Sequence, residues 1–226
     1  MQFTRALLLG VLAMSCSKPV IPLRVAAASD LTDTFEELKP LFGEPVEFTF
    51  GSSGLLSKQL QEGAPFDVFF SANAKFVDDA VVAGACDANT KKPYARGRLA
   101  LLGELDSAKR IAIANPDTAP YGLAAKQALQ KQDKWTAIES RLVFTENVRQ
   151  AVQLFDTGNA EAAFVAYATV NSRDGGVQLI DESLHAPIEQ TMVRCTRGKN
   201  PAAAQRFVDF LNTKAARDVL SRHGFR

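Results

Sequence analysis

Two serines, Ser29 and Ser53, stand where the sequence could bind a small anion. Each comes at the end of an apolar, strand-like run that closes with small residues, Val25-Ala26-Ala27-Ala28 and Phe50-Gly51-Ser52, and a helix-like segment follows at once. The first turn of a helix has unpaired N–H groups and carries the positive end of the helix dipole. A serine at that point can offer its amide and its hydroxyl to an oxyanion, so the pattern predicts anion binding at both positions.

We call such a place, where a strand-like run meets a helix start, a corner. Two more corners occur in the second half of the chain. One is the loop 115–122, whose Pro120 suits the first turn of a helix, and the other is Asn147-Val148. One such corner alone is explained as well by ordinary capping, because serine and asparagine cap helices in proteins that bind nothing. Ligands of open α/β sheets lie beyond the carboxyl ends of the strands, where all four corners gather. With two corners in each half, the sequence predicts a cage around one small anion.

Apolar strand-like runs alternate with amphipathic helix-like segments along the chain. The runs 23–28 and 67–72 are continuously apolar or small, as in buried parallel strands, and helical stretches at 202–211 and 215–223 end the sequence. This alternation predicts an α/β protein with mostly parallel sheets flanked by helices. The 226 residues suffice for one large domain or for two lobes of about 100 residues each. No long polar linker divides the chain, so two lobes would have to be joined by strands.

The net charge and the absence of several sequence motifs argue against some classes of protein. The net charge of +1 and the absence of runs of lysine or arginine argue against a nucleic-acid surface. The sequence has no phosphate loop, dinucleotide fingerprint or metal-ligand spacing, and Gly51-Ser52-Ser53-Gly54 does not match the nucleophile elbow of hydrolases. We therefore expect neither an enzyme nor a protein that needs a cofactor.

The N-terminal 18 residues have the pattern of an export signal. Arg5 precedes an apolar run at 6–14, which is the length of a signal-peptide core and too short to span a membrane. Cys16 follows the small residue Ser15, an arrangement similar to a bacterial lipoprotein processing site, although Ala13 stands where leucine is usual. We expect lipidation of Cys16, with simple signal cleavage as the alternative. Either outcome places the protein on the periplasmic or cell-surface side of a bacterial membrane.

Two cysteines remain beyond that segment, Cys86 and Cys195. In an oxidising compartment they can form a disulfide, provided that their Cα atoms lie within about 7 Å. Two unrelated, partly buried thiols explain the sequence almost as well, so both alternatives remain open.

Four motifs, in chain order, resemble those of the periplasmic molybdate-binding proteins of ABC importers. They are Ala26-Ala27-Ala28-Ser29, Phe50-Gly51-Ser52-Ser53, Gly63-Ala64-Pro65-Phe66-Asp67-Val68-Phe69-Phe70-Ser71-Ala72, and Glu146-Asn147-Val148-Arg149. The match runs from about Leu23 to the end of the chain. The resemblance implies a two-lobed type II solute-binding fold with its ligand cleft between the lobes. We expect residues 19–101 plus 194–226 to form lobe I and residues 102–193 to form lobe II.

The resemblance also implies a set of ligand donors. By motif position, Ser29 and Ser53 would each give a hydroxyl and an amide, Tyr121 and Val148 would give backbone N–H groups, and Tyr167 would give its phenolic O–H. A core tyrosine with its hydroxyl bonded elsewhere is an equal alternative for Tyr167. No direct ligand to the metal is implied, since molybdenum would be held only as its oxyanion.

Two positions depart from the family pattern. Asp30 follows Ser29 where leucine is common, and Tyr121 stands where a small residue is frequent. We expect Asp30 to point outward as an acidic residue at a helix start. If its carboxylate faced the ligand and accepted the ligand's proton in a hydrogen bond, it would favour a protonated oxyanion such as phosphate.

The predicted function is that of an exported, monomeric receptor that binds molybdate or tungstate and delivers it to an ABC permease. A receptor for another tetrahedral oxyanion, sulfate or phosphate, is the nearest alternative. A ligand-sensing domain of similar fold is a second alternative, and an enzyme on this scaffold is the least expected.

Overall fold

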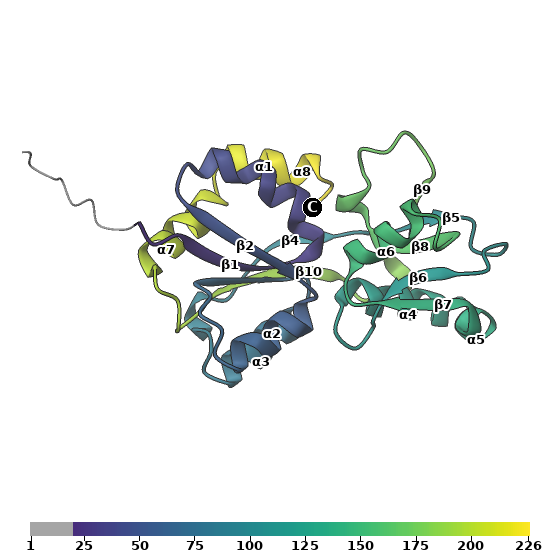
Figure 1. Ribbon diagram of the computed structural model, residues 1–226, viewed down its shortest axis with the longest axis horizontal. Coiled ribbons are helices and arrows are strands. Elements are labelled where there is room, and N and C mark those ends of the chain that lie inside the picture. Colours follow the sequence, from purple (N-terminus) through teal and green to yellow (C-terminus); the bar gives the residue numbers. More distant parts are fainter. Residues whose placement is uncertain (1–19) are drawn as a thin grey trace, which may run out of the picture.

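Two five-stranded sheets lie side by side in the computed structural model of the protein, each flanked by helices (Figure 1). The structure describes residues 20–226, so the predicted export segment 1–18 and Cys16 lie outside it. The sheets have the strand orders β2-β1-β3-β10-β4 and β7-β6-β8-β5-β9. The two-lobed α/β fold predicted from the sequence is confirmed, but each sheet is mixed and not mostly parallel, because the strands at and next to the lobe crossings, β5 and β10, run antiparallel to their neighbours.

The first lobe contains strands from both ends of the chain. Its strands are β1 (Leu23–Ala28), β2 (Val46–Gly51), β3 (Val68–Ser71), β4 (Lys92–Gly97) and β10 (Ile188–Arg194). Its helices are η1 (Ser29–Leu31), α1 (Thr32–Phe42), α2 (Ser53–Gln61), α3 (Ala74–Val82), η2 (Ala88–Thr90), α7 (Pro201–Phe210) and α8 (Lys214–Arg222). Strand β1 is parallel to β2 and β3, whereas β10 is antiparallel to β3 and β4.

The second lobe is built from the middle of the chain. Its strands are β5 (Leu99–Gly103), β6 (Ile111–Ala114), β7 (Leu142–Thr145), β8 (Ala162–Ala166) and β9 (Val177–Leu179). Its helices are α4 (Pro120–Lys131), α5 (Trp135–Ile138), η3 (Glu139–Arg141), α6 (Val148–Asp156), η4 (Tyr167–Thr169) and η5 (Glu182–Leu184). Strand β6 is parallel to β7 and β8, and β5 is antiparallel to β8 and β9.

The chain passes between the lobes twice. It leaves the first sheet at Arg98, between β4 and β5, and returns in the segment between β9 and β10. The expected lobe boundaries at 101/102 and 193/194 fall inside β5 and β10, which pair wholly in the second and the first sheet, respectively. An apolar run shows that a strand is buried but not which sheet it joins, so the sequence did not locate these crossings.

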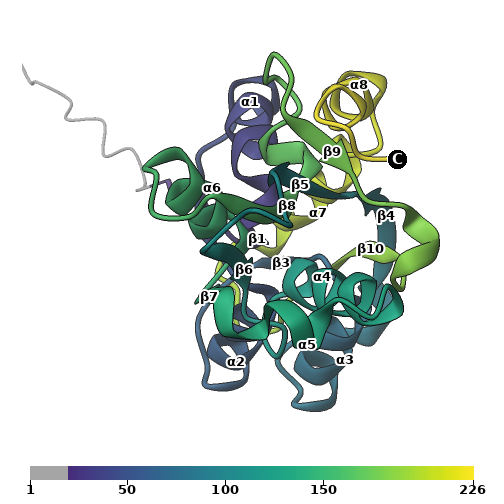
Figure 2. The ribbon, with the colours of Figure 1, turned by 90° about the vertical axis from the view of Figure 1, so that its right-hand side faces the viewer.

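Each sheet is covered on both faces. In both ribbon views α1 and α8 lie on one side of the first sheet and α2 and α3 on the other (Figures 1 and 2). On the first side an aromatic cluster fills the core, with the ring of Phe35 meeting Phe70 and Phe207 edge-on at centroid distances of 5.0 and 5.7 Å. No helix among residues 20–226 is long and apolar enough to cross a membrane.

Candidate functional site

Four of the five predicted donor residues line one small cavity between the lobes, with a volume of about 10 Å³. Ser29 begins η1 directly after β1, and Ser53 begins α2 after β2. Because β1 and β2 are parallel and in register, with Ala28 opposite Gly51, their carboxyl ends bring both serines to one edge of the first sheet. Tyr121 and Val148 come from the second lobe, in the first turns of α4 and α6.

The cavity presents hydrogen-bond donors that the protein itself leaves free. The hydroxyl of Ser53 accepts the N–H of Ala72 at 3.1 Å, so its own proton remains available. The N–H groups of Tyr121 and Val148 lie in first turns and have no acceptor within their own helices. Among the described residues, α2 and α4 begin without a side-chain cap at their N-cap positions. These helix starts can therefore donate to a ligand.

Ser52 also faces this cavity and was not predicted. It is the N-cap residue of α2, yet its hydroxyl makes no cap and its buried Oγ has no hydrogen-bond partner among residues 20–226. An N-cap serine normally accepts a bond from its helix. The doubled serine in Gly51-Ser52-Ser53-Gly54 is the sequence signal that points to it.

Backbone atoms join the lobes beside the cavity. The N–H of Gly54 in α2 donates to the carbonyl of Thr118 in the second lobe at 2.8 Å. A Cβ on Gly54 would lie 2.9 Å from the Cα and the carbonyl oxygen of Thr118, which is closer than side chains tolerate. Glycine at this position therefore permits the lobes to meet.

Asp30 does not point outward, and that expectation is wrong. Its side chain is buried, with the residue only 1% exposed, and it lines the same cavity. Its Oδ2 accepts the hydroxyl of Tyr121 at 2.9 Å and the Nε2 of Gln190 at 2.5 Å. The reason is that η1 turns Asp30 toward the lobe interface, where the hydroxyl of Tyr121, 91 positions later in the chain, donates to it.

Burial raises the pKa values of Asp30 and Tyr121. It raises the pKa of Asp30 from 3.8 to about 6, although the hydrogen bonds from Tyr121 and Gln190 act in the opposite direction. The pKa of Tyr121 lies well above its ordinary value, because the phenol is buried and faces the Asp30 carboxylate. The hydroxyl of Tyr121 thus stays a donor, and its large side chain covers the cavity from the second lobe.

Tyr167, the fifth predicted donor, is not brought to this cavity. It begins η4 directly after β8, and its ring lies beneath the guanidinium of Arg98, whose central carbon is 4.2 Å from the ring centroid. Gly224 packs against the same ring, and a Cβ there would approach Cδ1 to 2.5 Å. These contacts at the lobe crossing hold the ring away from the four helix starts.

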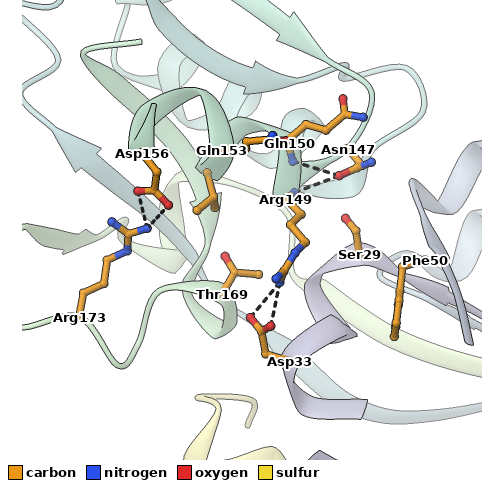
Figure 3. A pocket seen from close by; sticks show the side chains of 11 residues that line it. Ser29, Asp33, Phe50, Asn147, Arg149, Gln150, Gln153, Asp156, Thr169 and Arg173 are labelled. Carbon is orange, nitrogen blue, oxygen red and sulfur yellow. Dashed lines mark hydrogen bonds and ion pairs between the residues drawn. The ribbon is translucent and has the colours of Figure 1, made fainter. Parts of the chain in front are cut away.

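A wider groove of about 520 Å³ adjoins Ser29 (Figure 3). Arg149 of α6 spans it and places Nη1 2.9 Å from both carboxylate oxygens of Asp33 in α1. Farther along, Arg173 binds Asp156 within the second lobe at 2.7 and 2.8 Å. Both arginines are therefore paired at the groove and do not line the small cavity.

Metal ligation has no support in the described part of the chain. No group of three or more histidine, cysteine, aspartate or glutamate side chains among residues 20–226 could hold a metal ion. The cavity instead offers hydroxyl and amide donors, which suit an oxyanion.

Two lobes with helix starts converging on a cavity between them define a solute-binding protein. Residues 23–226 match the family described as bacterial extracellular solute-binding protein, and this chain belongs to that family. It is 34% identical to the molybdate-binding protein ModA of Rhodobacter capsulatus, over 97% of this chain and 93% of the relative. The solved periplasmic molybdate-binding protein of Azotobacter vinelandii is 30% identical with a TM-score of 0.84, covering 90% of this chain and 98% of that one.

A third relative bears on the N-terminal segment. A Bacillus subtilis protein that is 27% identical, over 92% of this chain and 88% of its own, carries a name that describes a substrate-binding lipoprotein of an ABC transporter.

Proposed function

We propose that this protein captures molybdate, and also tungstate, outside the cytoplasm and delivers it to the permease of an ABC importer. The observation that carries the proposal is the single cavity at which Ser29 and Ser53 of one lobe meet Tyr121 and Val148 of the other. Relatives named for molybdate binding match nearly the whole chain.

The donors that line the cavity can stabilise a dianion without a cationic side chain. Its space of about 10 Å³ has room for about one water molecule, so the lobes must move apart for an oxyanion to enter. Helix starts and hydroxyls provide partial positive charges that are fixed in place, and an enclosed site strengthens each of them. Because no arginine or lysine lines the cavity, selectivity would rest on its size and on the directions of its donors. Sulfate and phosphate receptors would use similar chemistry, and the relatives favour molybdate over both.

The remaining features of the proposal concern location and assembly. The family is extracellular, and a relative named as a lipoprotein supports an anchor at Cys16. We infer a monomer that is held at the membrane surface near its permease. The proposed function requires no cofactor besides the bound oxyanion.

The test is thermal unfolding and calorimetry with molybdate, tungstate, sulfate and phosphate. Molybdate at one hundred times its Kd should stabilise the protein by about 2.7 kcal/mol. Ser53→Ala should weaken molybdate binding roughly 10- to 100-fold, because a hydrogen bond to a charged group contributes about 1.5–3 kcal/mol.

Ser57→Ala is the matched control, since Ser57 lies in the same helix and is buried, but its hydroxyl donates to the carbonyl of Phe76 at 2.8 Å. It should leave molybdate affinity unchanged. Stabilisation by sulfate or phosphate, with none by molybdate or tungstate, would overturn the proposal.

A further inference from the structure

The two carboxyl oxygens of Asp30 have different surroundings. Oδ2 accepts hydrogen bonds from Tyr121 and Gln190, whereas Oδ1 is buried without a partner among the described residues. Asp30 lines the cavity together with Ser29 and Ser53. An unpaired carboxyl oxygen in a site for anions calls for an explanation, since buried polar atoms are nearly always hydrogen-bonded.

Neighbouring groups fix the orientation of this carboxyl. The hydroxyl of Tyr94 lies 3.1 Å from Oε1 of Gln190, which turns the Nε2 of that amide toward Asp30. Gly97 leaves room for the hydroxyl of Tyr121, because a Cβ at that position would collide with it. Oδ2 is thus held by donors from β10 of its own lobe and from α4 of the other lobe.

The charged and titratable groups around Asp30 do not neutralise it. The two phenols, Tyr94 and Tyr121, have pKa values well above their ordinary range and remain uncharged. The elements packed against η1 are α1, β2, η4 and α6. Charged or titratable groups on these elements are engaged with partners other than Asp30: Asp33 with Arg149, Glu47 with Arg24, and Tyr167 with Arg98.

An ionised Asp30 would oppose a dianion in the same cavity. Two negative charges in an enclosed, poorly solvated site repel strongly, and the usual outcome is that one of them takes up a proton. Burial has already raised the pKa of Asp30 to about 6, so a hundredfold shift in its equilibrium gives half protonation at pH 8 and a shift of about a thousandfold gives nearly complete protonation.

Building on the function proposed above, we propose that Asp30 is a specificity-determining residue that binds the oxyanion in its protonated form. Its Oδ1 takes a proton from solvent and donates it in a hydrogen bond to an anion oxygen, while Oδ2 continues to accept from Tyr121 and Gln190. Anions that carry only acceptors at neutral pH, such as molybdate, fit this arrangement. Hydrogen phosphate, which carries its own proton, would instead suit the ionised carboxylate.

Calorimetry of molybdate binding between pH 5.5 and 9, in pairs of buffers with different ionisation enthalpies, tests this directly. The wild-type protein should take up close to one proton at pH 8 and much less at pH 5.5. Its affinity should fall by up to tenfold for each pH unit above about 6.

Asp30→Asn provides the second measurement. The amide can place its NH₂ group where the protonated oxygen stood, so this variant should bind at pH 8 without proton uptake and with a flat pH profile. Asp33→Asn, in the neighbouring helix but half-exposed, should retain the uptake. Thermal unfolding of each variant checks that it folds, and the wild-type proton count does not depend on any variant.

The results separate this inference from the proposed function. Molybdate binding without proton uptake at pH 8 would overturn the role of Asp30 and leave the function intact. Tighter binding of phosphate than of molybdate at pH 8, again without proton uptake, would show that Asp30 is an ionised hydrogen-bond acceptor. That result would also overturn the proposed role of Asp30. No molybdate binding at any pH would overturn the proposed function itself, and this inference with it.

Discussion

Nη1 of Arg149 lies 2.9 Å from both oxygens of Asp33 and thereby joins helix α6 of the second lobe to helix α1 of the first. The pair stands at the groove beside Ser29, outside the small cavity (Figure 3). When the lobes separate, this ion pair must break. It therefore contributes to the stability of the closed protein without touching the proposed ligand.

We expect Arg149→Ala and Asp33→Ala each to weaken molybdate binding less than about fivefold, and mainly through faster release. Both side chains are about half exposed, and such pairs contribute only about 0.2–1 kcal/mol. The effect should shrink at high salt, because exposed charges are screened. Stopped-flow release rates, with the double variant to measure coupling, check this.

A matched control lies in the same groove. Arg173 and Asp156 form a similar pair wholly within the second lobe, so their replacement by alanine should leave the release rate unchanged. Equal effects from both pairs would show that linkage between the lobes is not the cause.

Gly97→Ala should disfavour the closed arrangement of the lobes. Its Cβ would collide with the Tyr121 hydroxyl and would come within 3.0 Å of the ring carbon Cζ, yet Gly97 itself lies in an ordinary strand conformation. We expect a loss of molybdate affinity of roughly 5- to 150-fold, from a steric cost of about 1–3 kcal/mol. Calorimetry at a single pH measures it.

A second substitution tests the cause of that loss. Tyr121→Phe removes the colliding oxygen, so the double variant should bind molybdate more tightly than Gly97→Ala alone. If Tyr121→Phe and Gly97→Ala instead reduce affinity additively, the collision is not the reason.

The four helix starts were predictable because their signals are local. An apolar run, small residues and a capping residue or proline lie within a few positions of one another at Ser29, Ser53, Tyr121 and Val148. Parallel pairing then places the ends of neighbouring strands together whatever the rest of the chain does. The sequence accordingly predicted the four donor positions that line the cavity from both lobes.

The contacts made between distant segments were not predictable. Asp30 turns inward because Tyr121 and Gln190, 91 and 160 positions away, supply its donors. Tyr167 is held away from the cavity by Gly224 and by Arg98. The edge strand β4 was also missed, since its sequence Lys92-Pro93-Tyr94-Ala95-Arg96-Gly97 lacks the apolar alternation of a half-buried strand.

Cys86 and Cys195 should form a disulfide when the protein meets a small-molecule disulfide such as oxidised glutathione. Their sulfur atoms lie 2.6 Å apart, and the two residues face each other in an antiparallel bridge. In the exchange both thiols lose their protons, the protein disulfide forms and two small-molecule thiols leave. The reaction should be slow at neutral pH, because hydrogen bonding with Cys86 and burial raise the pKa of Cys195.

The disulfide should raise the free energy of unfolding by about 2–4 kcal/mol, since it closes a long loop in the unfolded chain. Thiol titration before and after oxidation, with urea unfolding of both forms, measures this. Cys86→Ser should abolish the difference. Persistence of both thiols after prolonged oxidation at pH 9 would contradict the prediction.

Asp30 should make the ligand-free protein less stable as the pH rises. Its pKa is about 6 in the folded chain against an ordinary value of 3.8, so the folded state binds more protons than the unfolded state between these values. Its contribution to the free energy of unfolding is therefore full below about pH 4 and is lost as the pH rises through 6. At about 1.4 kcal/mol per pKa unit, the loss amounts to about 3 kcal/mol.

Asp30→Asn removes this titration, so the stability of the variant relative to the wild type should increase by about 3 kcal/mol between pH 4 and pH 7. Urea unfolding of both proteins at one-unit pH steps measures the difference, in which the other titrating groups cancel. The control variant Asp33→Asn should show no comparable rise across this interval, because the carboxylate of Asp33 in the wild type is half-exposed and paired with Arg149. A difference between Asp30→Asn and wild type that stays constant with pH would mean that folding does not raise the pKa of Asp30.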